Sequence, residues 1–177
     1  MDEQKTFELE VVSVRLVKDN PIYSEKKITC AKDAIAILGD LLSEMDREVV
    51  CIINLKMDGT PINCSFASIG AVEHAVAHPR DLLKCAILSN AVGMIMVHNH
   101  PSGSLQPSKD DCRITDNMLQ LSRLLNINFL DHIIVGGDNR EYFSFSEKGR
   151  LETPCMTFKE DYKELDFSSK GNKSRGR

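Results

Sequence analysis

The chain has 177 residues, of which 42% are hydrophobic, and its formal net charge is −4 at pH 7. This length and apolar content are typical of one globular domain with its own core. The acidic balance argues against a broad surface for the phosphate backbone of nucleic acid, because such affinity comes mainly from clustered Lys and Arg.

The six cysteines occur singly along the chain, which predicts free thiols in a reducing compartment rather than a disulfide framework. Residues 1–5 are mostly polar and acidic, unlike a signal peptide, and no apolar run approaches the ~20 residues that a membrane span needs. We therefore expect a cytoplasmic protein that does not bind membranes. The oligomeric state stays open.

The N-terminal part of the chain is predicted to place strands around one helix. Residues 31–44 repeat apolar side chains at helical spacing, and Thr29 is in the position of the N-cap. A hairpin turn is expected over 57–60. Strands are expected over 7–17, 48–55 and 62–68, and the first of them belongs to an extension over residues 1–29.

The rest of the chain alternates helices and strands. The strand over 91–98 is almost wholly apolar, which predicts that both of its faces are covered. Helices are expected over 79–89 and 109–125, and further strands over 129–136 and 140–145. We therefore expect one domain over 30–150, followed by a C-terminal extension over 151–177 whose basic end, from residue 168, is disordered.

Two histidines at the end of the 91–98 strand are the strongest candidates for metal ligands. His98 and His100 are two residues apart, so on a strand both imidazoles point to the same side. Asp111 is the third candidate, and its neighbour Asp110 is expected to face solvent. Two neutral nitrogens and a carboxylate, with a fourth position left to water, are the ligand set of a catalytic zinc site. The pattern predicts one Zn²⁺ ion, although iron and manganese accept the same ligands.

The same residues belong to a longer pattern. His98-x-His100, followed after seven residues by Ser108-x-x-Asp111, resembles the JAMM signature, also called JAB or MPN, of a class of metalloproteases. The chain is also similar to the JAB domain of the bacterial RadC family, over roughly residues 30–147. The similar segments are 47–48, 76–81, 98–103, 107–108, 130–136 and 142–145.

This resemblance implies a fold, a ligand set and a site. The fold is of the α/β (α+β) class: a JAB/MPN-like central mixed β-sheet flanked by helices, in a cytidine-deaminase-like layout. The implied zinc ligands are His98, His100 and Asp111. Ser108 matches the serine that is thought to steady the oxyanion of the tetrahedral intermediate. Ser108 and Asp111 also fit a capping box with Asp in place of Glu or Gln, so the two roles stay open together.

The general base must come from outside this motif, because the motif contains no glutamate. Glu48 matches the glutamate that precedes an apolar strand in RadC-like sequences, and it is our candidate for the catalytic base. A solvated acid at a strand entrance is the alternative reading of this residue. Glu44 and Glu73 are the other candidates for the base.

Asp131 and His132 open the last long strand and are not expected to bind the metal. A polar pair at a strand start more often satisfies backbone groups or supports a ligand from behind, and the orientation of a ligand imidazole by Asp131 is the disfavoured alternative. His74 and His78 are expected at the surface or as caps of the 79–89 helix.

The resemblance predicts a zinc metallopeptidase that hydrolyses a peptide or isopeptide bond of a peptide or protein substrate. The alternative is an accessory protein in DNA repair or mobile-element DNA transactions without protease activity, because the RadC family carries a DNA-repair association. Nucleic-acid binding has weaker support, since we find no helix-hairpin-helix segment ahead of the JAB region and the only basic cluster lies within 168–177. An inactive scaffold is disfavoured because every motif position is occupied.

Overall fold

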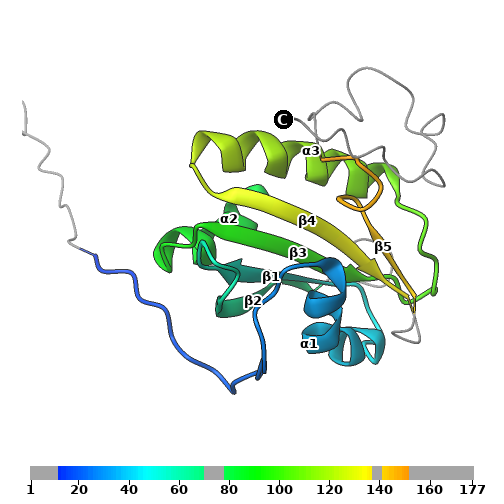
Figure 1. Ribbon diagram of the computed structural model, residues 1–177, viewed down its shortest axis with the longest axis horizontal. Coiled ribbons are helices and arrows are strands. Elements are labelled where there is room, and N and C mark those ends of the chain that lie inside the picture. The colour runs from blue at the N-terminus through cyan, green and yellow to red at the C-terminus, as the bar shows by residue number, and fades with distance from the viewer. Residues whose placement is uncertain (1–11, 70–77, 137–140, 152–177) are drawn as a thin grey trace, which may run out of the picture.

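The computed structural model describes residues 12–69, 78–136 and 141–151, and its centre is a mixed five-stranded sheet (Figure 1). The strand order is β2-β1-β3-β4-β5. Adjacent strands are antiparallel except for β3 and β4, which are parallel. The strands are β1 (Val49–Leu55), β2 (Pro61–Ile69), β3 (Gly93–Asn99), β4 (Asn128–Val135) and β5 (Tyr142–Ser144).

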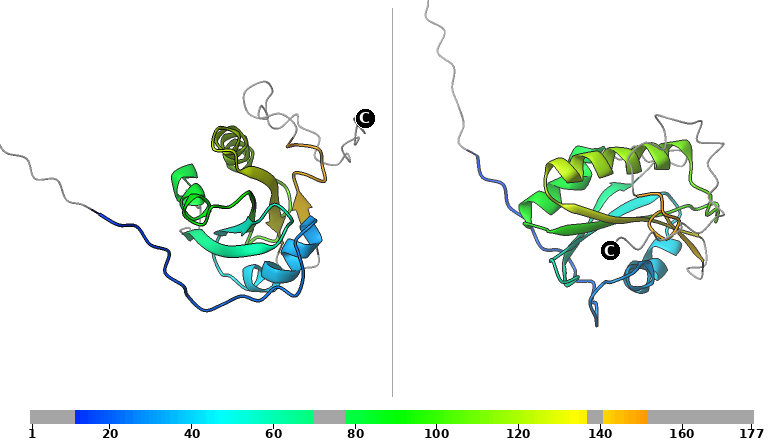
Figure 2. Two further views of the ribbon diagram at one scale, coloured as in Figure 1. Left: turned by 60° about the vertical axis from the view of Figure 1, so that its left-hand side comes forward. Right: turned by 45° about the horizontal axis from the view of Figure 1, so that its top comes forward.

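Helices cover both faces of the sheet, as the sequence predicts for this class (Figure 2). The helix α1 (Ala31–Ser43) packs on one face, where Leu38 and Leu42 contact the odd-numbered residues of β1 and β3. The helices α2 (Pro79–Leu88) and α3 (Lys109–Leu124) pack on the other face, against even-numbered residues such as Met96. This division follows from the alternation of side chains along a strand. Each Leu, Ile or Met fully buried in these two clusters stabilises the fold by roughly 1.5–3 kcal/mol.

Strand β3 lies in the middle of the sheet, and all seven of its residues are buried. Its neighbours are β1, with Val50 opposite His98, and β4, with Ile134 opposite His98. The prediction that this strand is covered on both faces is confirmed. The carboxyl end of β3 therefore places the His98 side chain on the face of the sheet that α3 covers.

The start of α1 differs from the prediction. Cys30, and not Thr29, is the N-cap residue, and it makes no side-chain capping bond. Thr29 instead donates its backbone N–H and its hydroxyl to the Asp33 carboxylate, both at 2.9 Å. The carboxylate reaches back from the first turn and holds Thr29, the residue before the N-cap, whereas a serine or threonine cap would accept an N–H of the helix itself. The negative charge is also favourable at this end of the helix dipole.

The predicted strand over 7–17 is wrong where the structure describes it. Residues 12–17 form no strand, and residues 7–11 lie outside the described part. Val12, Val14 and Val17 are 75%, 69% and 91% exposed, and Figure 1 shows this segment leading away from the sheet. Alternating apolar residues favour a strand only where a neighbouring strand supplies hydrogen bonds and packing.

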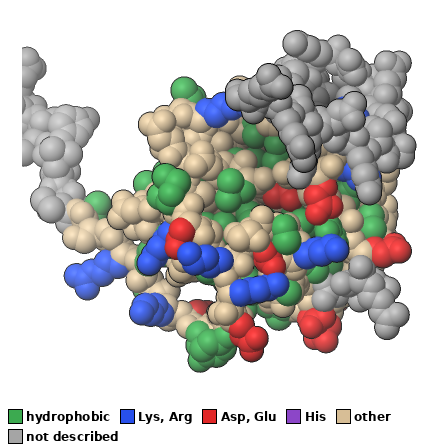
Figure 3. Space-filling view, viewed as in Figure 1, with side chains coloured by type: hydrophobic (Ala, Val, Ile, Leu, Met, Phe, Trp, Pro, Cys, Tyr) green, Lys and Arg blue, Asp and Glu red, His purple; other side chains and the backbone are tan. Residues whose placement is uncertain are grey.

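Other predictions also fall outside the described residues. These are the base candidate Glu73, His74 and the basic segment 168–177 on which the DNA-binding alternative depends. On the face seen in Figure 3, lysine and arginine side chains are interspersed with acidic ones. Among the residues described, no helix has the length and apolar character needed to cross a bilayer.

Candidate metal centre

Four side chains from three parts of the fold converge beside the end of β3. They are Glu48, His98, His100 and Asp111, and one nitrogen or oxygen atom from each lies within 4.8 Å of the others. His98 Nε2 is 2.9 Å from His100 Nε2 and 3.2 Å from Asp111 Oδ1. His100 Nε2 is 3.4 Å from Asp111 Oδ2. The structure thus brings together the three predicted ligands and the predicted base.

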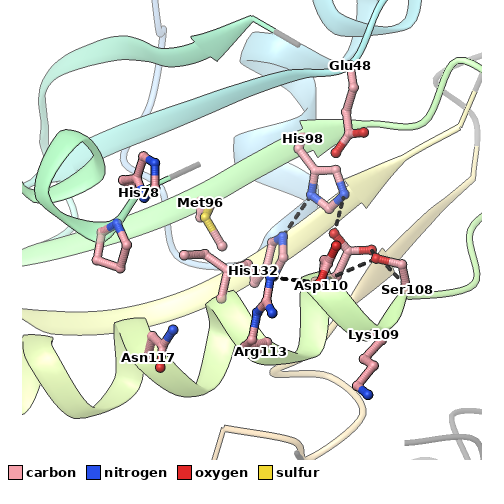
Figure 4. A pocket seen from close by; sticks show the side chains of 13 residues that line it. Glu48, His78, Met96, His98, Ser108, Lys109, Asp110, Arg113, Asn117 and His132 are labelled. Carbon is pink, nitrogen blue, oxygen red and sulfur yellow. Dashed lines mark hydrogen bonds and ion pairs between the residues drawn. The ribbon is translucent and has the colours of Figure 1, made fainter. Parts of the chain in front are cut away.

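The pairing of β1 with β3 explains why Glu48 reaches this point. Val50 is opposite His98 in the antiparallel register, so Glu48, two residues earlier, falls beside His100 on the same face. In Figure 4 its carboxylate points toward the ring of His98. Glu48 is half-buried, whereas Glu44 is exposed and ends α1 as its C-cap residue. Of these two base candidates, Glu48 is the one that lines the cleft.

Asn99 holds the backbone on both sides of Glu48, a role that was not predicted from the sequence. Its amide oxygen accepts the Val49 N–H at 2.8 Å, and its amide nitrogen donates to the Arg47 carbonyl at 3.1 Å. Asn99 is 2% exposed, so water does not compete with these bonds. The residue between the two histidines therefore fixes the position of the candidate base.

The first turn of α3 fixes Asp111 through a complete capping box. The Ser108 hydroxyl accepts the Asp111 N–H at 3.1 Å. Asp111 Oδ2 accepts the Ser108 N–H and its hydroxyl proton, both at 2.7 Å. This arrangement leaves Oδ1 facing His98, while Asp110 is exposed and pairs with Arg113 at 2.9 Å. The capping prediction and the outward direction of Asp110 are confirmed, and the oxyanion role of Ser108 stays a prediction.

Replacing Ser108 with Ala is expected to lower the free energy of unfolding by about 1 kcal/mol, because the Asp111 N–H loses its acceptor. Ser108→Thr keeps the hydroxyl and is the matched control. Urea unfolding of the two variants and the wild type measures the difference. An Ala variant as stable as the Thr variant would contradict the capping role.

His100 is oriented by the loop that follows it. Gly103 has a φ of 76°, a conformation that glycine adopts without strain, and this turn brings the Ser104 carbonyl to 2.7 Å from His100 Nδ1. A carbonyl only accepts, so Nδ1 carries the proton and donates it. In the neutral ring, Nε2 then presents a lone pair toward His98 and Asp111.

When no metal is bound, the charges and protons of the neighbouring imidazoles keep Asp111 ionised. Burial opposes the charge on Asp111, but the charge of His98 and the hydrogen bonds from His100 and His98 hold the pKa of this carboxyl well below its usual range. Burial also lowers the pKa of His100, yet the hydrogen bond and charge of Asp111, the Ser104 carbonyl and Glu48 outweigh it and raise that pKa above 6.5.

His132, and not Asp131, supports His98 from behind. His132 Nε2 lies 2.7 Å from His98 Nδ1, and its ring stacks on Phe145 with centroids 4.8 Å apart. Burial lowers the pKa of His132 well below 6.5, so the ring is neutral. Asp131 instead accepts bonds from the Ser144 hydroxyl and from two backbone N–H groups. The register of two parallel strands decides which of the pair faces His98, and the sequence does not show that register.

A cleft of about 550 Å³ opens beside the cluster. Glu48, His98 and Ser108 stand at one end of it (Figure 4), and Asp111, His78 and Pro79 also line it. Met96 and Ile114 give the cleft an apolar surface between these polar groups. Its size lies within the range of sites that bind small molecules or a short stretch of chain.

A family model described as the RadC-like JAB domain matches residues 28–150 of this chain. Its relatives include proteins named UPF0758 protein. The one from Thermotoga maritima is 41% identical over 107 residues, which cover 60% of this chain and 47% of the relative. Those from Pelodictyon phaeoclathratiforme and Methanosarcina acetivorans are 36% and 35% identical, over 71% of this chain and 56% and 54% of their own lengths.

The chain thus spans about half the length of the curated relatives that it matches. The name UPF0758 protein states no activity. The family match includes every residue of the four-residue cluster and all five strands of the sheet. Because this match covers well over half of the sequence, the chain belongs to the RadC-like JAB domain family.

Proposed function

We propose that this chain is a zinc-dependent hydrolase that cleaves a peptide or isopeptide bond. The observation that carries the proposal is the approach of metal-ligating atoms from two parts of the fold, the end of β3 and the first turn of α3. Two imidazole nitrogens lie 2.9 Å apart, and both oxygens of an ionised carboxylate lie 3.2 and 3.4 Å from them. Such atoms repel one another unless a proton or a cation lies between them, and a divalent cation satisfies all of them together.

The donor set fits zinc. Neutral imidazole and carboxylate are common zinc ligands, and two His with one carboxylate leave the fourth tetrahedral position open. His98, His100 and Asp111 hold the ion in this proposal. When bound, zinc lowers the pKa of a coordinated water toward neutrality and polarises the carbonyl of the substrate.

The protein's own groups complete the reaction. Glu48 takes a proton from the attacking water and delivers it to the leaving amine, a role that needs a carboxylate within reach of the ion and of the substrate. The half-buried position of Glu48 and the backbone bonds of Asn99 on either side support this role. Ser108 assists the oxyanion once its hydroxyl turns away from Asp111. The cleft beside Met96 receives the substrate chain.

Metal analysis followed by a cleavage assay tests this function. The purified chain is expected to bind one Zn²⁺ per molecule and to cleave members of a library of peptides and Lys-ε-linked isopeptides. A chelator should abolish the cleavage, and added Zn²⁺ should restore it. A zinc-loaded protein that cleaves nothing in the library would overturn the hydrolase proposal, and a protein that binds no zinc would overturn the metal site as well.

Zinc affinity is expected to fall as the pH is lowered. A proton and the metal compete for His100 Nε2, and because the pKa of His100 is raised, the loss begins above pH 6.5. Below that pKa, each pH unit should weaken apparent binding about tenfold for one competing proton. Chelator competition between about pH 8 and about pH 5.5 measures this slope. An affinity that does not change over this range would contradict the ligand role of His100.

A further inference from the structure

We infer that Thr115 and His132 are positioning residues that set the tautomer of His98, so that its Nε2 lone pair faces the metal. Both lie outside the three proposed ligands. The inference rests on the proposed function only for its metal, since the hydrogen-bond chain exists in the protein itself. Thr115 does not line the cleft, so it can act on the metal only through His132 and His98.

The chain of bonds begins at a backbone carbonyl, which fixes its direction. The Thr115 hydroxyl lies 2.6 Å from the carbonyl oxygen of Asp111 and donates its single proton there. The same Oγ1 lies 2.6 Å from His132 Nδ1, and with its proton already used it acts as the acceptor. His132 Nδ1 therefore carries the ring proton and donates it to Thr115.

The tautomer of His132 then determines which nitrogen of His98 carries the proton. A neutral imidazole has one N–H, so His132 Nε2 is left as an acceptor. It lies 2.7 Å from His98 Nδ1, which must supply the proton of that bond. His98 then holds its own ring proton on Nδ1 and has a lone pair on Nε2, the atom that faces His100 and Asp111.

Burial keeps this series of hydrogen bonds in one arrangement. Thr115, His98 and His132 are 0%, 1% and 1% exposed, so water cannot replace a missing partner. The His132 ring lies within 4° of parallel to Phe145, which holds its plane. His100 obtains the same tautomer from a loop carbonyl, whereas His98 depends on a second imidazole and a hydroxyl. Outer partners of this kind orient metal-binding histidines generally, and here the partner is itself a residue with two tautomers.

Removing the Thr115 hydroxyl should exchange the donor and acceptor in the hydrogen bond between His132 and His98. Without its acceptor, the proton on His132 Nδ1 would be buried and unpaired, which is unfavourable. The proton is better placed on His132 Nε2, where it donates to His98 Nδ1. His98 then carries its proton on Nε2, and this proton competes directly with the metal.

Two variants, one without the hydroxyl and one without the methyl group of Thr115, test the inference. Thr115→Val removes the hydroxyl and keeps the shape, and Thr115→Ser keeps the hydroxyl. The ring nitrogens of His98 are observed in metal-free protein at about pH 8 by long-range ¹H–¹⁵N correlation spectra, which distinguish the two tautomers of a neutral ring. Zinc affinity is measured by competition with a chromogenic chelator.

The wild type and Thr115→Ser are expected to show the Nδ1–H tautomer of His98, and Thr115→Val the Nε2–H tautomer. Zinc binding to Thr115→Val should weaken by about 10- to 100-fold, as for other lost outer partners, with Thr115→Ser close to the wild type. An Nε2–H tautomer in the metal-free wild type would overturn the inference, as would equal zinc affinity of the Val and Ser variants. If Thr115→Val fails to fold, the wild-type spectrum alone decides.

These outcomes separate the inference from the proposed function. A wild type that binds no zinc defeats the proposed function, while its His98 tautomer can still be read. A wild type that binds zinc and cleaves its substrate, with Thr115→Val doing so equally well, defeats only the role of Thr115 and His132.

Discussion

Glu48→Gln is expected to lower the kcat of hydrolysis by about 10²- to 10⁴-fold, the usual contribution of a general base. Gln has nearly the same size as Glu, but its amide cannot take a proton from water. Because the three proposed ligands are unchanged, zinc content should remain near one ion per chain. Steady-state rates on a substrate from the library, together with elemental analysis, measure both quantities.

Glu44→Gln is the matched control for this change. Glu44 is exposed at the end of α1, so its replacement should leave kcat unchanged. A Glu48→Gln variant that loses its zinc would show that Glu48 is a ligand, which its place within 4.8 Å of the other three groups allows. A Glu48→Gln variant with full activity would show that the base lies elsewhere.

His98→Ala is expected to abolish zinc binding at concentrations that saturate the wild type. The loss should exceed the roughly 10- to 100-fold that an outer partner contributes, because a direct ligand is removed. Zinc at about 100 times its Kd should stabilise the wild type by about 2.7 kcal/mol and should not stabilise the variant. Thermal unfolding with and without Zn²⁺ measures this difference.

The metal-free His98→Ala protein should also be less stable than the metal-free wild type, by about 1–3 kcal/mol, because His132 Nε2 loses its partner in a buried position. His78→Ala is the control, since His78 lies on the wall of the cleft outside the four-residue cluster. That variant should keep the zinc-induced increase in stability. An equal increase in His98→Ala would contradict the ligand role of His98.

Two features of the site could be predicted from the sequence because both are local. Residues two apart on a strand share a face, so His98 and His100 had to lie together once the apolar run formed a strand. Ser108 and Asp111 are three residues apart at a helix start, and the capping box that they form fixes the carboxylate within a single turn. The resemblance to RadC-like sequences then pointed to Glu48.

The partners of these residues depend on contacts far apart in the chain. Asn99 bonds to residues about fifty positions away, and His132 lies 34 positions after His98. Which of Asp131 and His132 faces the site depends on the register between β3 and β4, since a shift of one residue exchanges the two faces of a strand. Asp131, on the opposite face of the strand, accepts bonds from the Ser144 hydroxyl and the Ser146 N–H.

The predicted strand over 7–17 and the Thr29 cap failed for a related reason. The alternation of apolar and polar residues, or the presence of a threonine, indicates only a preference for a strand or a cap, and that structure forms only where neighbouring groups supply the hydrogen bonds and packing. Residues 12–17 have no neighbouring strand in the described part of the chain. The sequence by itself therefore determined the elements, the side on which the histidines lie and the orientation of Asp111, because each depends on a few adjacent residues. Only the tertiary structure decided which distant groups hold Glu48 and His98 in place, because strand register and burial arise when the whole sheet assembles.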